Sequence, residues 1–112
     1  MRFAIPLADG KLAVHFGHCA SFALLDVDPS TNEVVARQDV DAPPHQPGLL
    51  PPWLAERGVN RIIAGGMGQR ALSLFAEQGI EVIVGAPIEA PEQLVAQSIA
   101  GTLSVAGNAC DH

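Results

Sequence analysis

Two histidines and a cysteine lie close together in one short segment, His15-Phe16-Gly17-His18-Cys19. Imidazole nitrogen and thiolate sulfur are ligands of transition metals, and a glycine among them would allow a tight loop that points two of them the same way. The opposing interpretation is structural, because a histidine often hydrogen-bonds the backbone and a lone cysteine is commonly a small buried hydrophobe. The spacing alone leaves both open, with His15, His18 and Cys19 as candidate metal ligands.

A glycine-rich turn forms the second candidate site. Gly65, Gly66, Met67 and Gly68 come directly before an expected helix, whose first turn contains Arg70. Backbone N–H groups at a helix N-terminus attract anions, and a guanidinium adds a charged donor. The segment matches neither the Walker A pattern nor the dinucleotide pattern G-x-G-x-x-G. It therefore indicates anion binding of no particular specificity, unless the glycines only make a tight turn.

The sequence offers little support for catalysis. His18-Cys19 begins like the phosphatase loop of His, Cys, five residues and Arg, but Leu25 stands where the arginine belongs. Acidic residues are scattered, tyrosine is absent and no Gly-x-Ser-x-Gly elbow occurs. The C-terminal Cys110-Asp111-His112 is typical both of a metal-binding tail and of a frayed end. We therefore expect a binding protein and not an enzyme.

The composition indicates one domain over residues 1–112. The chain is 48% hydrophobic and 16% charged, so it can bury a core. Its net charge of −6 argues against nucleic-acid binding, because phosphates attract a basic surface. The apolar runs are too short to cross a bilayer, and two cysteines do not suggest a secreted disulfide scaffold. We expect a soluble cytoplasmic protein with no membrane or nucleic-acid partner.

The hydrophobic pattern predicts an α/β fold that places both candidate segments in loops after strands. Apolar and β-branched runs predict strands over Met1–Leu7, Ser21–Asp28, Glu33–Val40, Val59–Ala64 and Ile80–Val84. Helices are expected from about Pro51 to Gly58, over Gln69–Gln78, and from Pro91 to just before Gly101. A short turn makes the second and third strands an antiparallel hairpin, while alternating strands and helices predict right-handed parallel crossovers. The result is a mixed five-stranded sheet with helices packed against it.

Prolines place two further constraints on this arrangement. Pro6 should lie near the end of the first strand, because proline cannot donate to a central ladder. Five prolines between Asp41 and Pro52 predict an irregular loop, which we expect to be the most mobile internal stretch. His45, in the middle of this loop, could close over a bound ligand.

Three segments in combination resemble a known family. A start like Met1–Pro6, then His15-Phe16-Gly17-His18 leading into a strand that ends in Asp26, then Ala64–Ala71, is similar to the dinitrogenase iron–molybdenum cofactor-binding family over nearly the whole chain. That resemblance implies a ribonuclease H-like α/β fold without nuclease catalysis. The family includes small nitrogenase accessory factors that carry the iron–molybdenum cofactor or its precursor, and stand-alone homologues of unassigned role. A chain this small also resembles the orange-protein branch, whose members hold a molybdenum–copper sulfide cluster without covalent attachment.

The resemblance implies that the protein binds and carries an anionic metal–sulfur cluster, with molybdenum and either iron or copper, and that its partners include cluster donor or acceptor proteins. His15, His18 and Cys19 would be candidate ligands, and the Gly65–Gly68 backbone with Arg70 the anion cradle. The cluster would be held either through these ligands or non-covalently by the cradle alone. If the strands before these two loops are adjacent and parallel, both loops open at one edge of the sheet. The competing hypothesis is a regulatory module that binds a phosphate-bearing metabolite or a protein. A divalent-metal hydrolase is disfavoured, because clustered acidic residues are lacking.

Overall fold

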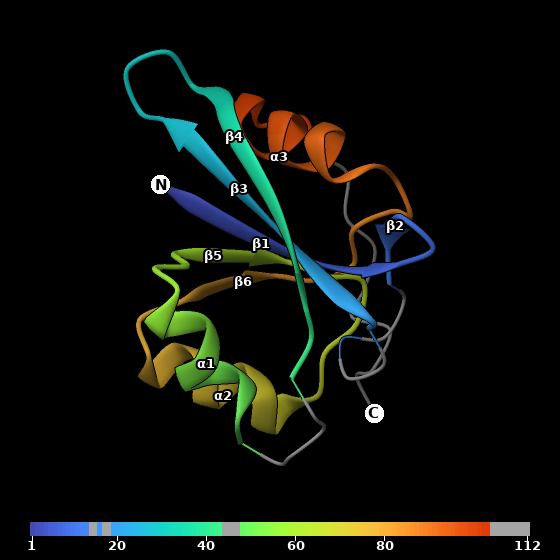
Figure 1. Cartoon of the computed structure of the whole chain (residues 1–112), viewed down its shortest axis with the longest axis vertical. Helices are drawn as coiled ribbons and strands as arrows, with labels where there is room; N and C mark the ends of the chain where they lie inside the picture. Colours follow the sequence, from blue (N-terminus) through green and yellow to red (C-terminus); the bar gives the residue numbers. More distant parts are fainter. Residues whose placement is uncertain (14–15, 17–18, 44–47, 104–112) are drawn as a thin grey trace.

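The computed structural model describes residues 1–13, 16, 19–43 and 48–103. These residues form a mixed sheet with helices on both faces (Figure 1). The strands are β1 (Arg2–Ala8), β2 (Lys11–Leu12), β3 (Ser21–Asp28), β4 (Glu33–Asp41), β5 (Arg61–Ile63) and β6 (Glu81–Ile83), and the helices are α1 (Leu50–Glu56), α2 (Gln69–Glu77) and α3 (Pro91–Ala100). α3 covers one face near β3 and β4, and α1 and α2 cover the other (Figure 1).

The strand order confirms the predicted α/β topology. The main path of the sheet is β4-β3-β1-β5-β6, with β1, β5 and β6 parallel and the β3–β4 hairpin antiparallel at one side. This is the mixed sheet of the ribonuclease H-like arrangement that the resemblance implied. The antiparallel β3–β4 hairpin and the parallel strands β5 and β6 therefore lie on opposite sides of β1, the central strand.

The prediction of five strands needs one correction, because β2 is a sixth. This two-residue strand pairs antiparallel with the end of β1, matching Leu7 with Leu12 and Ala8 with Lys11. Asp9 and Gly10, at φ values of 54° and 79°, form the tight turn that a two-residue hairpin needs. A strand of two residues is too short to show any hydrophobic alternation, so the sequence pattern could not reveal it.

Pro6 lies inside β1 and not near its end, opposite Phe22 of β3. The fold tolerates a proline here because the backbone N and C=O of Pro6 point away from β3. The Pro6 carbonyl accepts a hydrogen bond from the Ala13 N–H at 2.8 Å. On that side of β1, the pairing with β5 extends only to Ala4 and the pairing with β2 begins at Leu7. The missing proline N–H therefore falls in a gap between two partner strands.

The core is divided into two clusters by the sheet, because alternate strand residues point to opposite faces. On the α3 face, Phe3, Ile5 and Leu25 pack against Leu94 and Val95. The other face holds a larger cluster under α1 and α2, whose buried members are Ala4, Phe16, Phe22, Leu24, Leu54, Val59, Ile62, Ala64, Met67, Phe75 and Ile80. The second cluster includes residues from both candidate loops, so the core itself positions the site.

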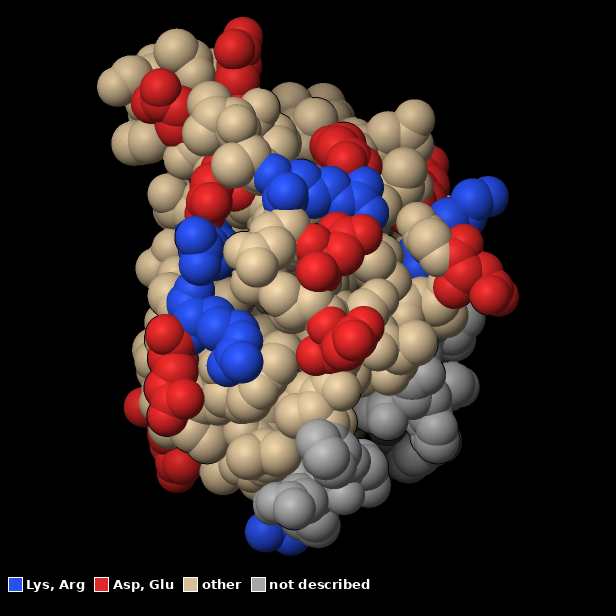
Figure 2. Space-filling model, viewed as in Figure 1, with Lys and Arg blue, Asp and Glu red and all other residues tan. Residues whose placement is uncertain are grey.

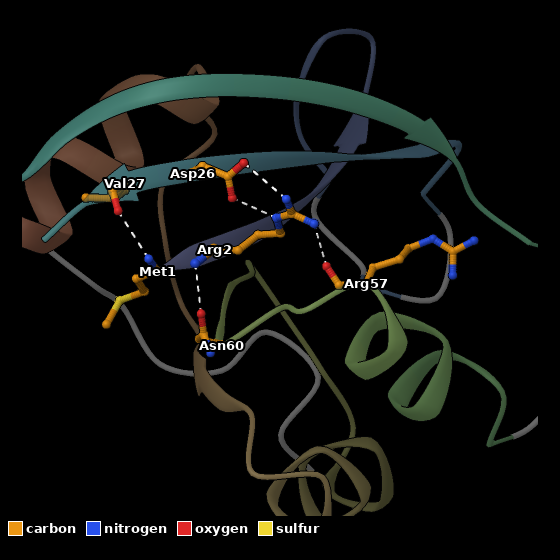
Figure 3. Close-up of polar contacts among 6 residues, drawn as sticks. All are labelled: Met1, Arg2, Asp26, Val27, Arg57 and Asn60. Atoms are coloured by element: carbon orange, nitrogen blue, oxygen red, sulfur yellow. Dashed lines mark hydrogen bonds and ion pairs between the residues drawn. The ribbon is translucent and has the colours of Figure 1, made fainter.

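Arg2 joins three elements at the edge of the sheet where β1 begins (Figure 3). Its guanidinium makes two hydrogen bonds to the Asp26 carboxylate, at 2.7 and 3.1 Å, and a third to the carbonyl of Arg57 just after α1, at 2.6 Å. The Arg2 backbone N–H donates to Asn60 Oδ1 at 2.9 Å. These contacts hold α1 and the start of β5 against β1, at the end opposite to the candidate loops.

The proline-rich segment is only partly within the described residues. β4 extends to Asp41, and α1 begins at Leu50 with Pro51 and Pro52 in its first turn, as expected of proline at a helix start. Residues 44–47, which include His45, lie outside the described part, so the predicted flap stays a prediction. None of the described helices has the length and apolar character required to cross a membrane.

Candidate functional site

The histidine-containing segment and the glycine turn meet at one edge of the sheet. β1 and β5 are adjacent and parallel, so the ends of both strands lie at the same side of the sheet. The histidine-containing loop follows β2, which pairs with the end of β1, and the glycine turn follows β5. A hydrogen bond joins the two loops directly, because the Phe16 N–H donates to the carbonyl of Gly66 at 3.1 Å. The structure therefore confirms that the sheet brings the two predicted segments together.

Phe16 anchors its loop to the core. Its side chain is 5% exposed, and its ring lies 5.6 Å from that of Phe22 in β3 and 5.5 Å from that of Phe75 in α2, measured between centroids. The contact with Phe75 is edge-to-face, which is a favoured geometry for aromatic pairs. This role was missed in the sequence analysis, where Phe16 was only a spacer between candidate ligands. The available signal was a large aromatic residue between two histidines in a loop.

The glycine turn is held from two sides by its own carbonyl groups. Gly65 accepts a hydrogen bond from the Gly85 N–H at 2.9 Å, and Gly66 accepts the bond from Phe16. Met67 is only 1% exposed, and its side chain packs in the cluster under α2. A ligand in this turn could therefore contact Met67 only through its backbone. Together these contacts give the turn a fixed position between the loops that follow β1 and β6.

The N-terminus of α2 is open where a ligand would approach. The first hydrogen bond of the helix runs from the Leu72 N–H to the carbonyl of Gly68, at 3.1 Å. The N–H groups of the three preceding helical residues therefore have no acceptor within the helix. The helix has no side-chain cap and no acidic residue in its first turn, whereas Arg70 in that turn is exposed. These features make the local potential favourable for an anion.

Gly68 is not required by the backbone or by internal packing. Its φ and ψ, −68° and 156°, are available to every residue, and a Cβ at this position would meet no atom within 4 Å. The missing side chain therefore leaves open space directly before the helix. Close approach of a ligand to the backbone is one of the main uses of such a glycine.

Cys19 lies between the loop and the core. Its side chain is half-buried against the cluster that contains Phe16 and Phe22. Desolvation by burial raises the pKa of the Cys19 thiol to about 11, so the thiol is protonated at neutral pH. A metal at this sulfur would have to displace that proton, since the thiolate is the ligating form.

The other predicted metal ligands lie outside the described residues. His15 and His18 belong to this group, as does the C-terminal Cys110-Asp111-His112. Within the ranges that are described, no three His, Cys, Asp or Glu side chains gather closely enough to hold a metal ion. The ligand role of His15, His18 and Cys19 therefore stays a prediction.

One carboxylate at this edge was not singled out by the sequence analysis. Glu89 follows β6, and its backbone carbonyl accepts a hydrogen bond from Leu12 of β2 at 3.3 Å. Its Oε2 atom is buried and has no hydrogen-bond partner in the described part of the chain. Isolated in the sequence, Glu89 gives no pattern that would have marked it.

Comparison with models of protein families identifies the family of this chain. The family model described as "Dinitrogenase iron-molybdenum cofactor" matches residues 1–101. The chain belongs to that family. The resemblance inferred from the His15 segment and the Gly65–Gly68 turn is thereby confirmed.

One curated protein and several solved structures are similar to this chain at low sequence identity. An uncharacterised protein of Methanocaldococcus jannaschii is 31% identical over 85 residues, which cover 73% of this chain and 72% of that protein. The crystal structure of the protein PH0822 is 27% identical with a TM-score of 0.86, covering 96% of each chain. The apo form of the orange protein from Desulfovibrio gigas is 26% identical with a TM-score of 0.71, covering 96% of this chain and 93% of its own. The two solved structures therefore match the chain over nearly its whole length, and the Methanocaldococcus jannaschii relative matches about three quarters of it.

Proposed function

We propose that this protein binds an anionic metal–sulfur cluster, of the iron–molybdenum or molybdenum–copper sulfide kind, and carries it as cargo without catalysing a reaction. The cluster would sit against the Gly65–Gly68 backbone and the first turn of α2, with Arg70 beside it. His15, His18 and Cys19 would be ligands from the neighbouring loop. Membership of the family and likeness to the orange protein support cofactor binding, and the chemistry of the site supports an anionic cargo.

The observation that supports the cradle most directly is the open space at Gly68. A glycine that is needed neither for its φ nor for packing fits a site where a bulky ligand approaches the backbone. The hydrogen bond from Phe16 to Gly66, two residues before Gly68, supports a site that both loops would share. Potential ligands and N–H donors would then reach one cargo from two directions.

Charge explains why such a cradle is needed. The protein has a net charge of −6, so its general field repels an anionic cluster. A local group of uncapped N–H donors and one guanidinium would attract an anion at the binding point. We expect the cargo to bind there and nowhere else on the described surface.

Reconstitution tests this function. The apo protein is incubated with tetrathiomolybdate, with and without copper(I), desalted, and measured for bound metal and for sulfide-to-metal charge-transfer absorbance. Gly68→Ala should retain clearly less cluster than the unchanged protein, because the added methyl group occupies the open space. Ser73→Ala, a substitution on the exposed side of the same helix, is the matched control. Equal retention by all three proteins would contradict the cradle.

The ligand assignment is tested separately. The double variant His15→Ala, Cys19→Ala should lose cluster while keeping the circular dichroism spectrum of the unchanged apo protein. If that variant retains the cluster and Gly68→Ala does not, the N–H cradle alone holds the cargo. If neither substitution matters, the proposed function is wrong.

The uncapped first turn of α2 would also accept a phosphate, which is the basis of the competing hypothesis. Binding of a colourless phosphate-bearing nucleotide, measured by calorimetry on the apo protein, separates the two. Tight nucleotide binding that Arg70→Gln abolishes, together with no cluster retention, would favour the regulatory module. Cluster retention without nucleotide binding favours the carrier.

A further inference from the structure

We infer that β4 is a self-association surface, which pairs antiparallel with β4 of a second copy of this chain and joins two sheets into one. β4 is a nine-residue edge strand, whereas β6 at the opposite edge has only three residues. An edge strand presents unpaired backbone donors and acceptors that another strand can use. β4 crosses the front of the molecule in Figure 1, with the sheet behind it.

The backbone groups on the open side of β4 can be identified from the sheet register. Met1 and Val27 exchange two hydrogen bonds, Met1 N–H to Val27 O at 3.1 Å and Val27 N–H to Met1 O at 2.8 Å. Bonding alternates along an antiparallel ladder, so odd-numbered residues of β3 bond β1 and even-numbered residues bond β4. Between Ala36 and Asp41, where the register is regular, the β4 residues opposite the even-numbered ones are Ala36, Gln38 and Val40. Arg37, Asp39 and Asp41 therefore direct their N–H and C=O groups away from the sheet.

This parity restricts how two β4 strands can pair. A residue whose N–H and C=O point outward must lie opposite another such residue of the second copy. These residues are all odd-numbered, so the numbers of two paired residues add to an even sum, and the two-fold axis passes through a residue and not between two residues. An axis at Arg37 would place Arg37 opposite itself, and an axis at Asp39 would place two Asp39 carboxylates together. An axis at Gln38 places Arg37 opposite Asp39 of the second copy, twice. An axis at Asp39 also places Arg37 opposite Asp41, but only the axis at Gln38 pairs opposite charges without placing two like charges opposite one another.

The remaining positions fit the same register. Ala36 lies opposite Val40 of the second copy, both on the face that α1 and α2 cover, and Gln38 lies opposite Gln38. Val35, which is 63% exposed, is the extra residue of a β-bulge, because Asp26 pairs with Ala36 while Val27 pairs with Val34. The bulge ends the regular part of the strand, so the paired segment is centred on Gln38.

The charges that set the register are available at the surface. Arg37 forms ion pairs with Asp39 of its own strand, at 2.8 Å, and with Glu92 of α3. Both Asp39 oxygens accept hydrogen bonds from Arg37 of the same strand, at 2.8 and 3.1 Å. The Asp39 side chain is 48% exposed, and each carboxylate oxygen has a second lone pair that can accept from a second guanidinium. Figure 2 shows basic and acidic side chains close together on the face that β4 crosses, as a surface that pairs with itself requires. The short paired segment predicts a weak dimer.

Charge reversal tests the register, with sedimentation equilibrium at physiological salt from micromolar to millimolar protein. The unchanged protein should dimerise within this range. Asp39→Arg should weaken dimerisation by roughly tenfold or more, because two attractive pairs become repulsive. In that variant Arg37 keeps its partner Glu92, so the fold is retained. A chain that stays monomeric at millimolar concentration, or an undiminished Asp39→Arg dimer, overturns the proposal.

A mixed experiment gives the matched control. The variant Arg37→Asp, made with Glu92→Gln so that the new acid does not face Glu92, should not self-associate. Mixed with Asp39→Arg, it should form a heterodimer, because every arginine again lies opposite an aspartate. Failure of two folded variants to associate overturns the proposal.

Amide hydrogen exchange tests the strand pairing itself, because an association through side-chain charges alone would not protect alternate backbone N–H groups. Raising the protein concentration should protect the N–H groups of Arg37 and Asp39, whereas those of Gln38 and Val40 should be protected at every concentration because they bond β3. Dimerisation without this alternation would overturn the β4 interface. None of these tests depends on cluster binding.

Discussion

The backbone of Phe16 donates a hydrogen bond to the carbonyl of Gly66 at 3.1 Å, and this bond joins the two segments that the sequence marks as candidate sites. The Phe16 ring, in turn, lies between Phe22 and Phe75. One residue therefore ties the loop after β2 to the turn after β5 and to the core beneath both. The geometry of the candidate site depends on this anchor.

Truncating the anchor should destabilise the protein. Because Phe16 is buried and contacts two aromatic rings, Phe16→Ala should lower the free energy of unfolding by about 3 kcal/mol. Phe16→Leu should lower it by about 1 kcal/mol, since an apolar side chain of similar volume remains. Urea unfolding followed by circular dichroism measures both. A Phe16→Ala cost below that of Phe16→Leu would contradict the anchor.

Cys19 should be an unreactive thiol in the apo protein. Its pKa of about 11 leaves a thiolate fraction of only about 10⁻⁴ at pH 7, and the thiolate is the nucleophile. In a Cys110→Ser background, the rate of alkylation by iodoacetamide should therefore keep rising up to pH values near 11. The same protein unfolded in guanidinium is the control, and its rate should level off at a lower pH. A native rate that levels off near pH 8 would contradict the burial argument.

If Cys19 ligates the cluster, binding must release its proton. Reconstitution at neutral pH in weak buffers should then liberate about one more proton per cluster than reconstitution of Cys19→Ala. Calorimetry in two buffers with different ionisation enthalpies measures this difference. Equal proton release would show that Cys19 only packs against the core.

Arg70 should contribute by charge, not by ligation. Arg70→Gln should weaken cluster retention by about threefold to tenfold, and the loss should shrink as salt is raised, because screening reduces the contribution of an exposed charge. Arg61→Gln, at the opposite end of β5, removes the same charge away from the cradle and should have little effect. A salt-independent loss in Arg70→Gln would indicate a structural role.

The ion pair of Arg2 and Asp26 should make stability depend on pH. The hydrogen bonds from Arg2 lower the pKa of Asp26 in the folded state. The ion pair therefore stabilises the folded state at pH values above the ordinary aspartate pKa of about 3.9. That stabilisation should decrease as pH falls through the lowered pKa. Because both side chains are about one-third exposed, it should amount to about 1 kcal/mol or less.

Asp26→Asn measures this contribution. The difference in free energy of unfolding between the unchanged protein and this variant should be largest near neutral pH and should decline in acid. Asp9→Asn, in the exposed turn between β1 and β2, is the control and suits that turn equally well. A difference that grows in acid would contradict the assignment.

The sequence by itself determined the elements other than the two-residue β2, and their order. Strands such as Ser21–Asp28 and helices such as Pro91–Ala100 follow from local patterns, because burial imposes periods of two or 3.6 residues and prolines and glycines mark the ends. The alternation of strands and helices after β4 likewise determined the parallel crossovers. Combined in one chain, the His15 segment and the glycine turn also indicated the family.

Only the tertiary structure decided what these residues contact. The bond from Phe16 to Gly66, the burial of Cys19 and the open space at Gly68 all depend on segments that are distant in sequence. The place of Pro6 within β1 depends on where two partner strands end, and the outward direction of Arg37 and Asp39 depends on register across three strands. A local sequence pattern reports the burial of residues along one segment. The contacts of a residue, its desolvation and its strand register depend on a second segment, so only the packing of the whole chain determines them.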